Sequence, residues 1–557
     1  MRRGDGVSDL ASSRQGYAVT DLTIGHVIRD KAAKLRDAQF LSYIPDGRTF
    51  TFADVDRASN ILANGLMALG IKPGDHVALM MANRPEMLFL LMALGKIGAV
   101  SVPLNIAARG DQMRHYLSQS DSVVLVVEEA FLAQLDDVED ALLNLGKVVL
   151  FRESSTAKEV PDRVGACARL QTTDFAQLEE APDSAPDVVV KFSDLAMLLY
   201  TSGTTGLSKA VMFTQAYALL YGIDQVENYG FRSSDTVYVC TPLFHAHGLL
   251  SHTYGPLVLG AKVALSLRFS ASHFWNEVRD CGATVLSMLG SMANMLWSQP
   301  PSADDARHAV RQATIAPAPS AGVQFSERFG MNILGAYGLT DYGMGTILGP
   351  DEFPRKVGSA GRPRPGMQVR VVDENDMPLP TGEIGEIVMR SDIPWSTSLG
   401  YYKMPDATLA ARRNFWFHTG DRGYFDADGY LFFGDRKKDA IRRRGENISA
   451  FEIEQVLAKH DAVADVAVFA APSGVGEDEV ACALVVKPGM TLSEAQVIEY
   501  CGKHMPYYMV PRYLQFLPDL PRSATHKVEK YKLQKAAAER IDSFWDREKA
   551  GIALRRR

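Results

Sequence analysis

The stretch from residue 198 to residue 209 reads Leu198-Leu199-Tyr200-Thr201-Ser202-Gly203-Thr204-Thr205-Gly206-Leu207-Ser208-Lys209. An apolar run typical of a buried strand leads into small and hydroxylated residues and then a lysine. Glycines let backbone N–H groups approach an anion closely, hydroxyls donate further hydrogen bonds, and the lysine adds a full positive charge. The pattern is not the Walker loop G-x-x-x-x-G-K-[ST]. We interpret it as a polyphosphate-binding loop. An ordinary surface loop is the weaker alternative, because so many donors directly after a buried strand are uncommon.

Downstream, the motif Tyr337-Gly338-Leu339-Thr340-Asp341 combines three kinds of functional group. The Tyr337 ring offers a face for a purine, the Thr340 hydroxyl suits a phosphate, and the Asp341 carboxylate suits a hard cation. Mg²⁺ is usually held by a carboxylate together with substrate phosphates. The motif therefore predicts a contact with Mg²⁺ and nucleotide, with a Tyr/Gly turn between strands as the alternative.

Four further motifs follow: His418-Thr419-Gly420-Asp421, Phe433-Gly434-Asp435-Arg436, Arg444-Gly445-Glu446-Asn447 and Pro521-Arg522-Ser523…Lys527. In order and spacing, the six motifs together resemble the adenylate-forming superfamily. That superfamily contains acyl-CoA synthetases, aryl-CoA ligases, beetle luciferases and amino-acid adenylation domains. The resemblance covers nearly the whole chain and does not depend on one loop.

The resemblance implies a role for each matching residue. It implies catalytic roles for Lys209, His245, Thr340, Asp341 and Lys527, with Asp341 also the metal ligand. It implies nucleotide contacts for Thr201, Ser202, Gly203, Thr204, Thr205, Gly335, Ala336, Tyr337, Asp421 and Arg436, the last two at the ribose. It implies contacts with CoA for Arg444, Gly445 and Arg268, and a hinge at Lys438. Lys527 matches a mobile lysine whose charge offsets the attack of one anion on another.

The sequence departs from the family pattern at three places. Asp341 stands where the family usually has Glu, and His526 stands where Gly commonly precedes the mobile lysine. Lys530 and Lys532 are therefore competitors for the role of Lys527. The stretch 316–319 reads Ala-Pro-Ala-Pro in place of a Gly-Gly-Ala-Pro-like turn, and proline makes this wall of the pocket stiffer. His247, close to His245, matches no family role.

Bulk properties bound the remaining possibilities. A chain of 557 residues is too long for one core, so we expect two or more domains. The formal net charge of −7 argues against a nucleic-acid binder. Five cysteines without a C-x-x-C pair fit reduced thiols. The apolar stretch 87–104 is interrupted by Lys96 and Pro103, which favours a helix followed by a strand over a membrane span. We therefore expect a cytoplasmic protein.

Alternating helix and strand patterns predict parallel sheet covered by helices. Examples are a helix from Thr51 to Leu69, a strand at Val77–Met81, a helix at Pro85–Gly95 and a strand at Val100–Pro103. The fold class we predict is a large N-terminal α/β domain, with parallel and mixed sheets and a small β subdomain, and a small mobile α+β C-terminal domain. We expect its parts at residues 1–435, 436–438 (hinge), 439–540 and 541–557 (tail).

The resemblance implies an acid–thiol ligase that uses ATP, Mg²⁺ and coenzyme A. A carboxylic acid becomes an acyl-AMP with release of pyrophosphate, and the acyl group then passes to CoA. The sequence at residues 442–449 and 325–329 most resembles that of crotonobetaine/carnitine-type and medium-chain acyl-CoA ligases. We expect the walls of the acyl pocket to come from residues 217–230, residues 287–292 and Ala336. Three alternatives stay open: loading of a carrier protein, a luciferase-like oxidoreductase, and a non-catalytic nucleotide-binding relative. A homodimer is compatible with the sequence, and the class of acid stays open.

Overall fold

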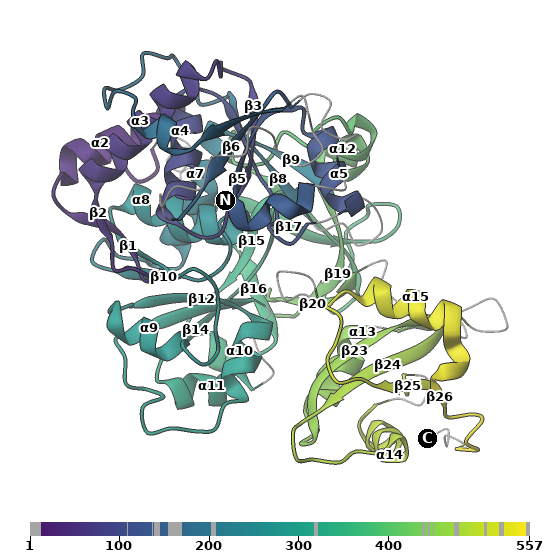
Figure 1. Ribbon diagram of the computed structural model, residues 1–557. Helices are drawn as coiled ribbons and strands as arrows, with labels where there is room; N and C mark the ends of the chain where they lie inside the picture. The colour runs from purple at the N-terminus through teal and green to yellow at the C-terminus, as the bar shows by residue number, and fades with distance from the viewer. Residues whose placement is uncertain are drawn as a thin grey trace, which may run out of the picture.

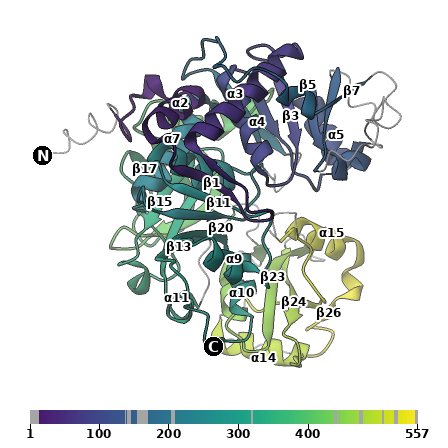
Figure 2. The same cartoon turned by 60° about the vertical axis from the view of Figure 1, so that its left-hand side comes forward.

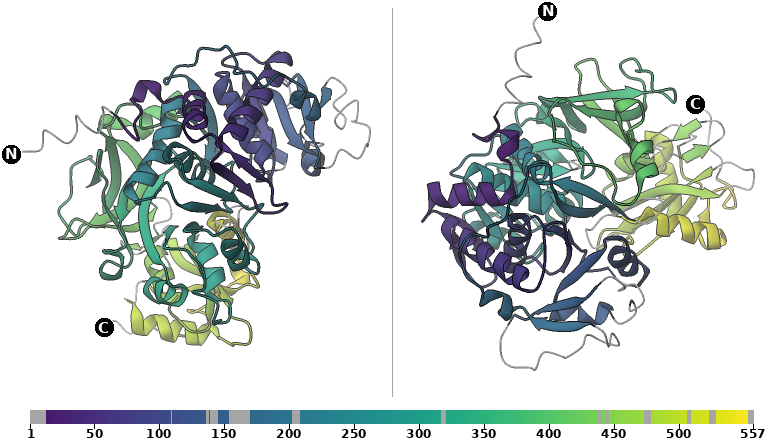
Figure 3. Two further views of the ribbon diagram at one scale, coloured as in Figure 1. Left: turned by 90° about the vertical axis from the view of Figure 1, so that its left-hand side faces the viewer. Right: turned by 90° about the horizontal axis from the view of Figure 1, so that it is seen from above.

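The protein has a large body and a smaller C-terminal domain beside it (Figure 1). The computed structural model describes residues 13–108, 110–135, 138, 145–153, 170–201, 208–316, 321–436, 441–443, 446–448, 450–472, 478–505, 509–522 and 528–552. Figure 3 shows the C-terminal domain, in yellow-green, on the side of the body away from the purple N-terminal helices. The predicted division into a large and a small part is thus confirmed as a fold class.

One sheet of the large body combines consecutive strand–helix–strand units. Over the described residues, its seven strands lie in the order β7-β6-β5-β3-β4-β8-β9. Every neighbouring pair is parallel except β8 and β9. The strands are β3 (His76–Met80), β4 (Val100–Pro103), β5 (Ser122–Glu128), β6 (Lys147–Phe151), β7 (Gln171–Asp174), β8 (Leu195–Thr201) and β9 (Lys209–Thr214). The antiparallel β8–β9 pair allows a short loop to return the chain beside itself.

The helices of this part follow the apolar periodicity of the sequence. They are α2 (Ile24–Leu35), α3 (Phe52–Ala68), α4 (Pro85–Lys96), α5 (Gly110–Gln119), α6 (Ala176–Glu179), α7 (Gln215–Asn228) and α8 (Gly255–Leu259), with η1 (Val19–Asp21) and η2 (Glu129–Leu135) as 3₁₀ turns and η4 (His247–Tyr254) as a π-helix. Helix α3 begins with a capping box in which the side chains of Thr51 and Asp54 bond each other's backbone N–H. Figure 2 shows α3 and α4 together beside β3.

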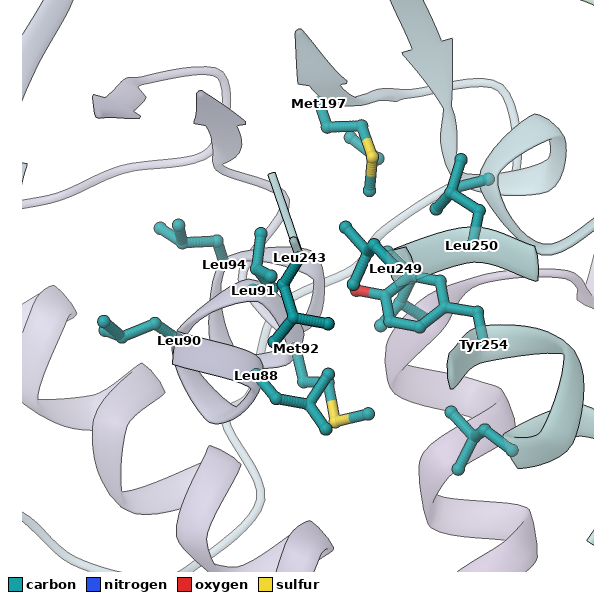
Figure 4. Close-up of a cluster of buried hydrophobic side chains, with 14 of the residues drawn as sticks. Leu88, Leu90, Leu91, Met92, Leu94, Met197, Leu243, Leu249, Leu250 and Tyr254 are labelled. Carbon is teal, nitrogen blue, oxygen red and sulfur yellow. The ribbon is translucent and has the colours of Figure 1, made fainter. Parts of the chain in front are cut away.

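A hydrophobic core joins α4 to η4. In Figure 4, Leu88, Leu91 and Met92 of α4 lie beside Leu249 and Tyr254 of η4. All five side chains are buried. Helix α4 is apolar on every side because it is covered by neighbours on every side. None of the helices within the described ranges has the length and apolar character needed to cross a bilayer.

A second, longer sheet extends from parallel strands to an antiparallel β subdomain. Its order over the described residues is β17-β18-β19-β20-β16-β15-β14-β13-β12-β10-β11-β1-β2. The strands are β1 (Gln39–Tyr43), β2 (Thr49–Thr51), β10 (Thr236–Val239), β11 (Lys262–Leu265), β12 (Val285–Leu289), β13 (Gln312–Ala316), β14 (Asn332–Leu339), β15 (Gly343–Leu348), β16 (Ser359–Pro363), β17 (Met367–Val372), β18 (Gly385–Ser391), β19 (Phe417–Phe425) and β20 (Leu431–Arg436). Its connections include α9 (Phe274–Asp280), α10 (Gly290–Trp297), α11 (Gly322–Phe329), α12 (Pro405–Ala411), η5 (Phe353–Arg355) and η6 (Arg413–Phe415).

The C-terminal domain is an α+β unit with its own cores. It contains β21 (Ile441–Arg443), β22 (Glu446–Ile448), α13 (Ala450–Leu457), β23 (Val463–Pro472), β24 (Asp478–Val486), α14 (Glu494–His504), β25 (Tyr513–Phe516), α15 (Lys530–Arg540), η7 (Ile541–Ser543) and β26 (Trp545–Asp546). Strand β26 pairs with β25, so the predicted tail from residue 541 is wrong in its first part. The buried Phe544 and Asp546 hold this segment against the domain.

Two local features concern the start of α14 and the edge of the first sheet. The cap of α14 is Ser493, which bonds reciprocally with Gln496, although the pair Thr491 and Glu494 also has the spacing of a capping box. Both pairs have the required spacing, and the apolar periodicity alone does not distinguish them. Within residues 153–186, a segment of poor periodicity that we expect to wrap the surface, β7 adds an edge strand to the first sheet.

Candidate active site

A large cavity lies where the two sheets of the body meet the C-terminal domain. Its volume is about 2050 Å³, and its lining comes from strand ends, α7, η4 and α13. Most of the predicted site residues that the structure describes lie in this lining: Thr201, Lys209, His245, Arg268, Gly335, Ala336, Tyr337, Thr340, Asp341 and Asp421. Residues distant in the sequence therefore converge on one chamber.

The phosphate-loop motif lies between two paired strands. Thr201 ends β8, Lys209 begins β9, and the two residues face each other in the ladder. The Thr201 hydroxyl donates to the Lys209 carbonyl at 3.4 Å. Ser202, Gly203, Thr204 and Thr205 lie outside the described residues. The predicted strand before the loop is confirmed, and Lys209 belongs to the strand after it.

The two predicted ribose residues face each other on neighbouring strands. Asp421 on β19 is paired with Arg436 on β20. The Asp421 carboxylate is buried and accepts a hydrogen bond from the Tyr337 hydroxyl at 2.7 Å. The Asp421 backbone N–H donates to the Thr419 hydroxyl at 3.1 Å. Three sequence motifs thus meet at one point of the cavity.

A tyrosine that the sequence analysis missed connects Lys209 to Asp341. The Lys209 ammonium lies 4.5 Å from the centroid of the Tyr401 ring, a cation–π contact. Burial, and then the Asp341 carboxylate as a negative charge and hydrogen-bond acceptor, raises the pKa of the Tyr401 phenol. Tyr401 also forms a backbone bridge to Val211 of β9. Its sequence context gave no signal, since the contact is made only when the two sheets meet.

A buried acid–histidine group lies beside the ribose position. His418 approaches Glu386 (Nδ1 to Oε2, 3.3 Å) and Asp376 (Nε2 to Oδ1, 3.8 Å). Glu386 also approaches Arg413 at 3.2 Å and accepts from the Gly420 backbone N–H at 3.3 Å. Of this motif, the sequence pointed only to Asp421. His418, the first residue of the motif, approaches both acids from the strand that also contains Asp421.

The lining of the cavity also contains the predicted acyl-side residues. His245 follows β10 in a turn closed by its N–H to the Pro242 carbonyl, and its ring lies 4.6 Å from the Phe244 ring. Tyr221, Gln225, Leu289, Met292 and Ala336, which lie in the ranges expected to form the acyl-pocket walls, belong to the lining, and their acyl role stays a prediction. Leu289 and Ala336 are strand residues, so this wall is part sheet and part helix.

The C-terminal domain supplies part of the lining as well. Phe451, Gln455, Val456 and Lys459 come from α13 and the turn after it. The Phe451 ring meets Phe433 of β20 edge to face, with centroids 5.7 Å apart. The sequence does not single out α13, because nothing in its amphipathic pattern separates a face toward a cavity from a face toward a core.

Several predicted residues lie outside the described parts of the chain. These are Lys438, Arg444, Gly445, Lys527 and the second part of the 316–319 wall, from Pro317. Only the backbone of Arg436 is described. Their roles stay predictions.

Comparisons with known proteins agree with this arrangement. A family model described as AMP-binding enzyme matches residues 28–402, and one described as AMP-binding enzyme C-terminal domain matches residues 452–527. The crotonobetaine/carnitine–CoA ligase of Salmonella paratyphi C is 32% identical over 492 residues, which cover 87% of this chain and 93% of the relative.

Solved structures have the same fold. The anthranilate CoA ligase AuaEII in complex with anthranoyl-AMP aligns with a TM-score of 0.84 at 23% identity, covering 96% of this chain and 99% of that chain. The o-succinylbenzoate coenzyme A synthetase MenE of Bacillus subtilis in complex with AMP aligns with a TM-score of 0.77 at 26% identity, covering 91% and 98%.

Proposed function

Because the chain belongs to the AMP-binding enzyme family, we propose that it is an ATP-dependent acid–CoA ligase. It converts a carboxylic acid, ATP and CoA into acyl-CoA, AMP and pyrophosphate. The 32% identity to a CoA ligase along most of both chains supports the acid–thiol class. The observation that carries the proposal is the meeting of Tyr337, Asp421, Lys209 and Asp341 in one cavity that continues to an acyl-side wall.

The nucleotide lies at the end of the cavity formed by β14 and β19. Gly335, Ala336 and Tyr337 present strand backbone and an aromatic ring to the adenine, and Asp421 accepts from the ribose hydroxyls. The Tyr337 hydroxyl fixes the Asp421 carboxylate at 2.7 Å before the ligand arrives. Arg436 provides a second ribose contact from the strand paired with β19. A preorganised acceptor loses less entropy on binding than a free one.

In the first half-reaction, a carboxylate oxygen of the acid attacks the α-phosphorus of ATP. The new O–P bond forms as the bond to the pyrophosphate oxygen breaks, giving acyl-AMP and pyrophosphate. Thr201–Thr205, Thr340, Lys209 and Lys527 offset the negative charge that accumulates between the two anions. Lys209 is held by the Tyr401 ring, which fixes its stem next to the phosphate loop.

Asp341 is the residue that would hold Mg²⁺. Among the described residues, no group of three or more His, Cys, Asp or Glu side chains is arranged to bind a metal by itself. A single carboxylate fits Mg²⁺ when substrate phosphates and water complete the shell. The ion would neutralise phosphate charge, and Tyr401 beside Asp341 orients the carboxylate.

In the second half-reaction, the thiol of CoA attacks the acyl carbonyl and AMP leaves. We propose that residues 1–435 and 439 onward move as two units about Lys438. The movement withdraws Lys527 and presents Arg444 and Gly445 along the pantetheine, with Arg268 near the nucleotide of CoA and His245 at the acyl entrance. Arg268 and His245 already line the cavity.

Replacing Lys527 by Ala tests the two-step scheme. We expect Lys527→Ala to reduce ATP–pyrophosphate exchange by about a hundredfold or more, since lost transition-state charge stabilisation has effects of that size. CoA thioester formation from supplied acyl-AMP should stay within a few-fold of wild type.

Lys532→Ala is the matched control. Lys532 is exposed on α15, bonds with Glu529, and competes with Lys527 in the sequence pattern. Equal loss of both half-reactions in Lys527→Ala, or loss of exchange in Lys532→Ala alone, would contradict the assignment. A wild-type protein that supports no exchange with any acid would be a non-catalytic relative. One that acylates only a phosphopantetheinyl protein would be a carrier-loading enzyme.

A further inference from the structure

Two adjacent strands present polar side chains toward α7 and η4. Ser287 of β12 and Thr314 of β13 are directly opposite each other in a parallel ladder, so both point to the same face of the sheet. Their neighbours Leu286, Met288 and Ala313 point to the other face, into the core below. The face toward α7 has Ser287 and Thr314 at positions where an apolar core would place valine or leucine.

Thr314 has a buried, unpaired hydroxyl, and the residue belongs to the cavity lining. The side chain lines the chamber and only 3% of the residue is exposed. Its Oγ1 has no hydrogen-bond partner among the described residues. Buried polar atoms in folded proteins nearly always have a partner, in protein, ligand or ordered water. A ligand group that can donate or accept would supply the missing partner of this hydroxyl.

Two more polar side chains lie in the same wall. His247 lines the cavity, and its Nε2 forms a hydrogen bond with the Ser287 hydroxyl. Gln225 of α7 also lines it, and the hydrogen bond that its amide nitrogen makes within the described residues goes to the Met344 sulfur at 3.7 Å, a weak acceptor. We call Gln225, His247 and Thr314 the polar wall.

The charges near this wall cancel. Asp224, the neighbour of Gln225 on α7, forms ion pairs with Arg14 at 3.0 Å and with Arg364 at 2.6 Å. Arg14 also pairs with Glu227. Two acids and two arginines thus leave no net charge, and Asp224 is not part of the cavity lining. A cationic tail would find no uncompensated carboxylate in this group.

We propose that the acid substrate has an uncharged hydrogen-bonding group, a hydroxyl, carbonyl or amide, that contacts the polar wall. The inference rests on the proposed function and specifies its acid. A plain alkyl chain would bury the Thr314 hydroxyl and the Gln225 amide without partners. A site with buried polar groups discriminates against an analogue that lacks the matching group. His247, which had no role in the reaction, is a specificity residue in this scheme.

Pairs of acids that differ by one hydroxyl test the proposal. ATP–pyrophosphate exchange would be measured with butanoate against hydroxybutanoates, benzoate against hydroxybenzoates, and 4-trimethylammoniobutanoate. In one of the pairs, we expect kcat/KM for the hydroxylated acid to exceed that for its parent by about tenfold or more, the usual effect of one hydrogen bond in a dry site. The trimethylammonium acid should be poorer than both.

The residue itself is tested with Thr314→Val, which removes the hydroxyl and keeps the shape. We expect the preference for the hydroxylated acid to fall about tenfold, with little change for the parent acid. Thr314→Ser should restore the preference. Thr172→Val is the matched control, because the Thr172 hydroxyl also lacks a partner among the described residues but lies on β7, away from the cavity.

Three outcomes would overturn the inference. The first is a preference for the parent or trimethylammonium acids. The second is an unchanged preference in Thr314→Val, which would mean that water satisfies the Thr314 hydroxyl. The third is a change of preference in Thr172→Val equal to that in Thr314→Val. Exchange with no carboxylic acid, in this panel or beyond it, would contradict the proposed function and, with it, this inference.

Discussion

Tyr337 and Asp421 are the residue pair on which nucleotide recognition depends in our scheme. Tyr337→Phe keeps the ring but removes the donor to the buried Asp421 carboxylate. Hydrogen bonds to charged groups contribute about 1.5–3 kcal/mol, so we expect KM for ATP to rise roughly tenfold or more. KM for the acid should stay within about twofold, because the acyl wall is untouched. Steady-state kinetics with each substrate varied in turn provides the measurement.

Tyr342→Phe is the control for this prediction. Tyr342 is equally buried and stacks on Phe417 with centroids 4.6 Å apart, but it is outside the cavity lining. A similar rise in KM for ATP in both variants would mean that Tyr337 acts through general packing and not through Asp421.

At the level of single residues, the sequence predicted the identity of the important side chains better than it predicted the contacts that hold them. Asp421 and Arg436 were assigned separately, and their pairing across β19 and β20 was not foreseen. The contact between Tyr401 and Lys209 was missed because these residues are joined only by tertiary structure. Local motifs identify chemistry, whereas orientation depends on partners far along the chain.

Among the elements, the crossing of α7 with η4 and α8 sets the position of the acyl wall. A Cβ on Gly222 would lie 2.5 Å from the Gly255 nitrogen and 2.5 Å from the Leu250 oxygen, both backbone atoms. Gly222→Ala must therefore separate the elements, and overpacking of this kind costs about 1–3 kcal/mol. We expect a lower free energy of unfolding and, since Tyr221 and Gln225 are on the same helix, a raised KM for the acid.

Gly502→Ala on α14 is the matched control, because a Cβ there meets nothing within 4 Å. Replacing this helical glycine by alanine should raise the free energy of unfolding by up to about 1 kcal/mol. Urea unfolding of both variants checks the pair. An unchanged free energy of unfolding in Gly222→Ala would show that α7 does not pack closely against η4 and α8 at this position.

Elements with strong local signals were predicted almost to the residue, and the others were not. The strand Val100–Pro103 is confirmed, and the helix predicted at Pro85–Gly95 ends one residue later, at Lys96. The π-helix η4 was not foreseen, since its register has no sequence pattern of its own and arises where α7 packs closely against it. The sequence allows two caps for α14, Thr491 and Ser493, because both have the spacing of a capping box, and the structure has Ser493.

For the whole molecule, the order of motifs predicted the two-part architecture, but not how one chamber forms. Residues of α13 line the cavity together with strand ends of the body, and no single motif encodes that contact. The β subdomain is hydrogen-bonded to the parallel strands through β16, β15 and β14 in turn, so it continues the larger sheet. Long-range docking of this kind depends on shape and burial, which motifs do not specify.

His252 makes the stability of the whole fold depend on pH. Its ring is fully buried beside His247 and Phe231, and its Nδ1 donates to the His247 carbonyl at 2.9 Å. Burial lowers the pKa of His252 from its ordinary 6.5 to about 4, and the hydrogen bond opposes this only in part. Between these values the unfolded chain binds a proton that the folded chain does not, so acidification from pH 6.5 toward 4 favours unfolding.

We therefore expect His252→Asn, which keeps a donor for the His247 carbonyl, to lose less unfolding free energy than wild type over that pH window. This should hold even if the variant is less stable at neutral pH, because the prediction concerns the slope and not the absolute value. Urea unfolding of the large body at a series of pH values measures it. His504→Asn, at an exposed histidine on α14, should keep the wild-type slope. Parallel curves for wild type and His252→Asn would show that the buried ring does not govern acid stability.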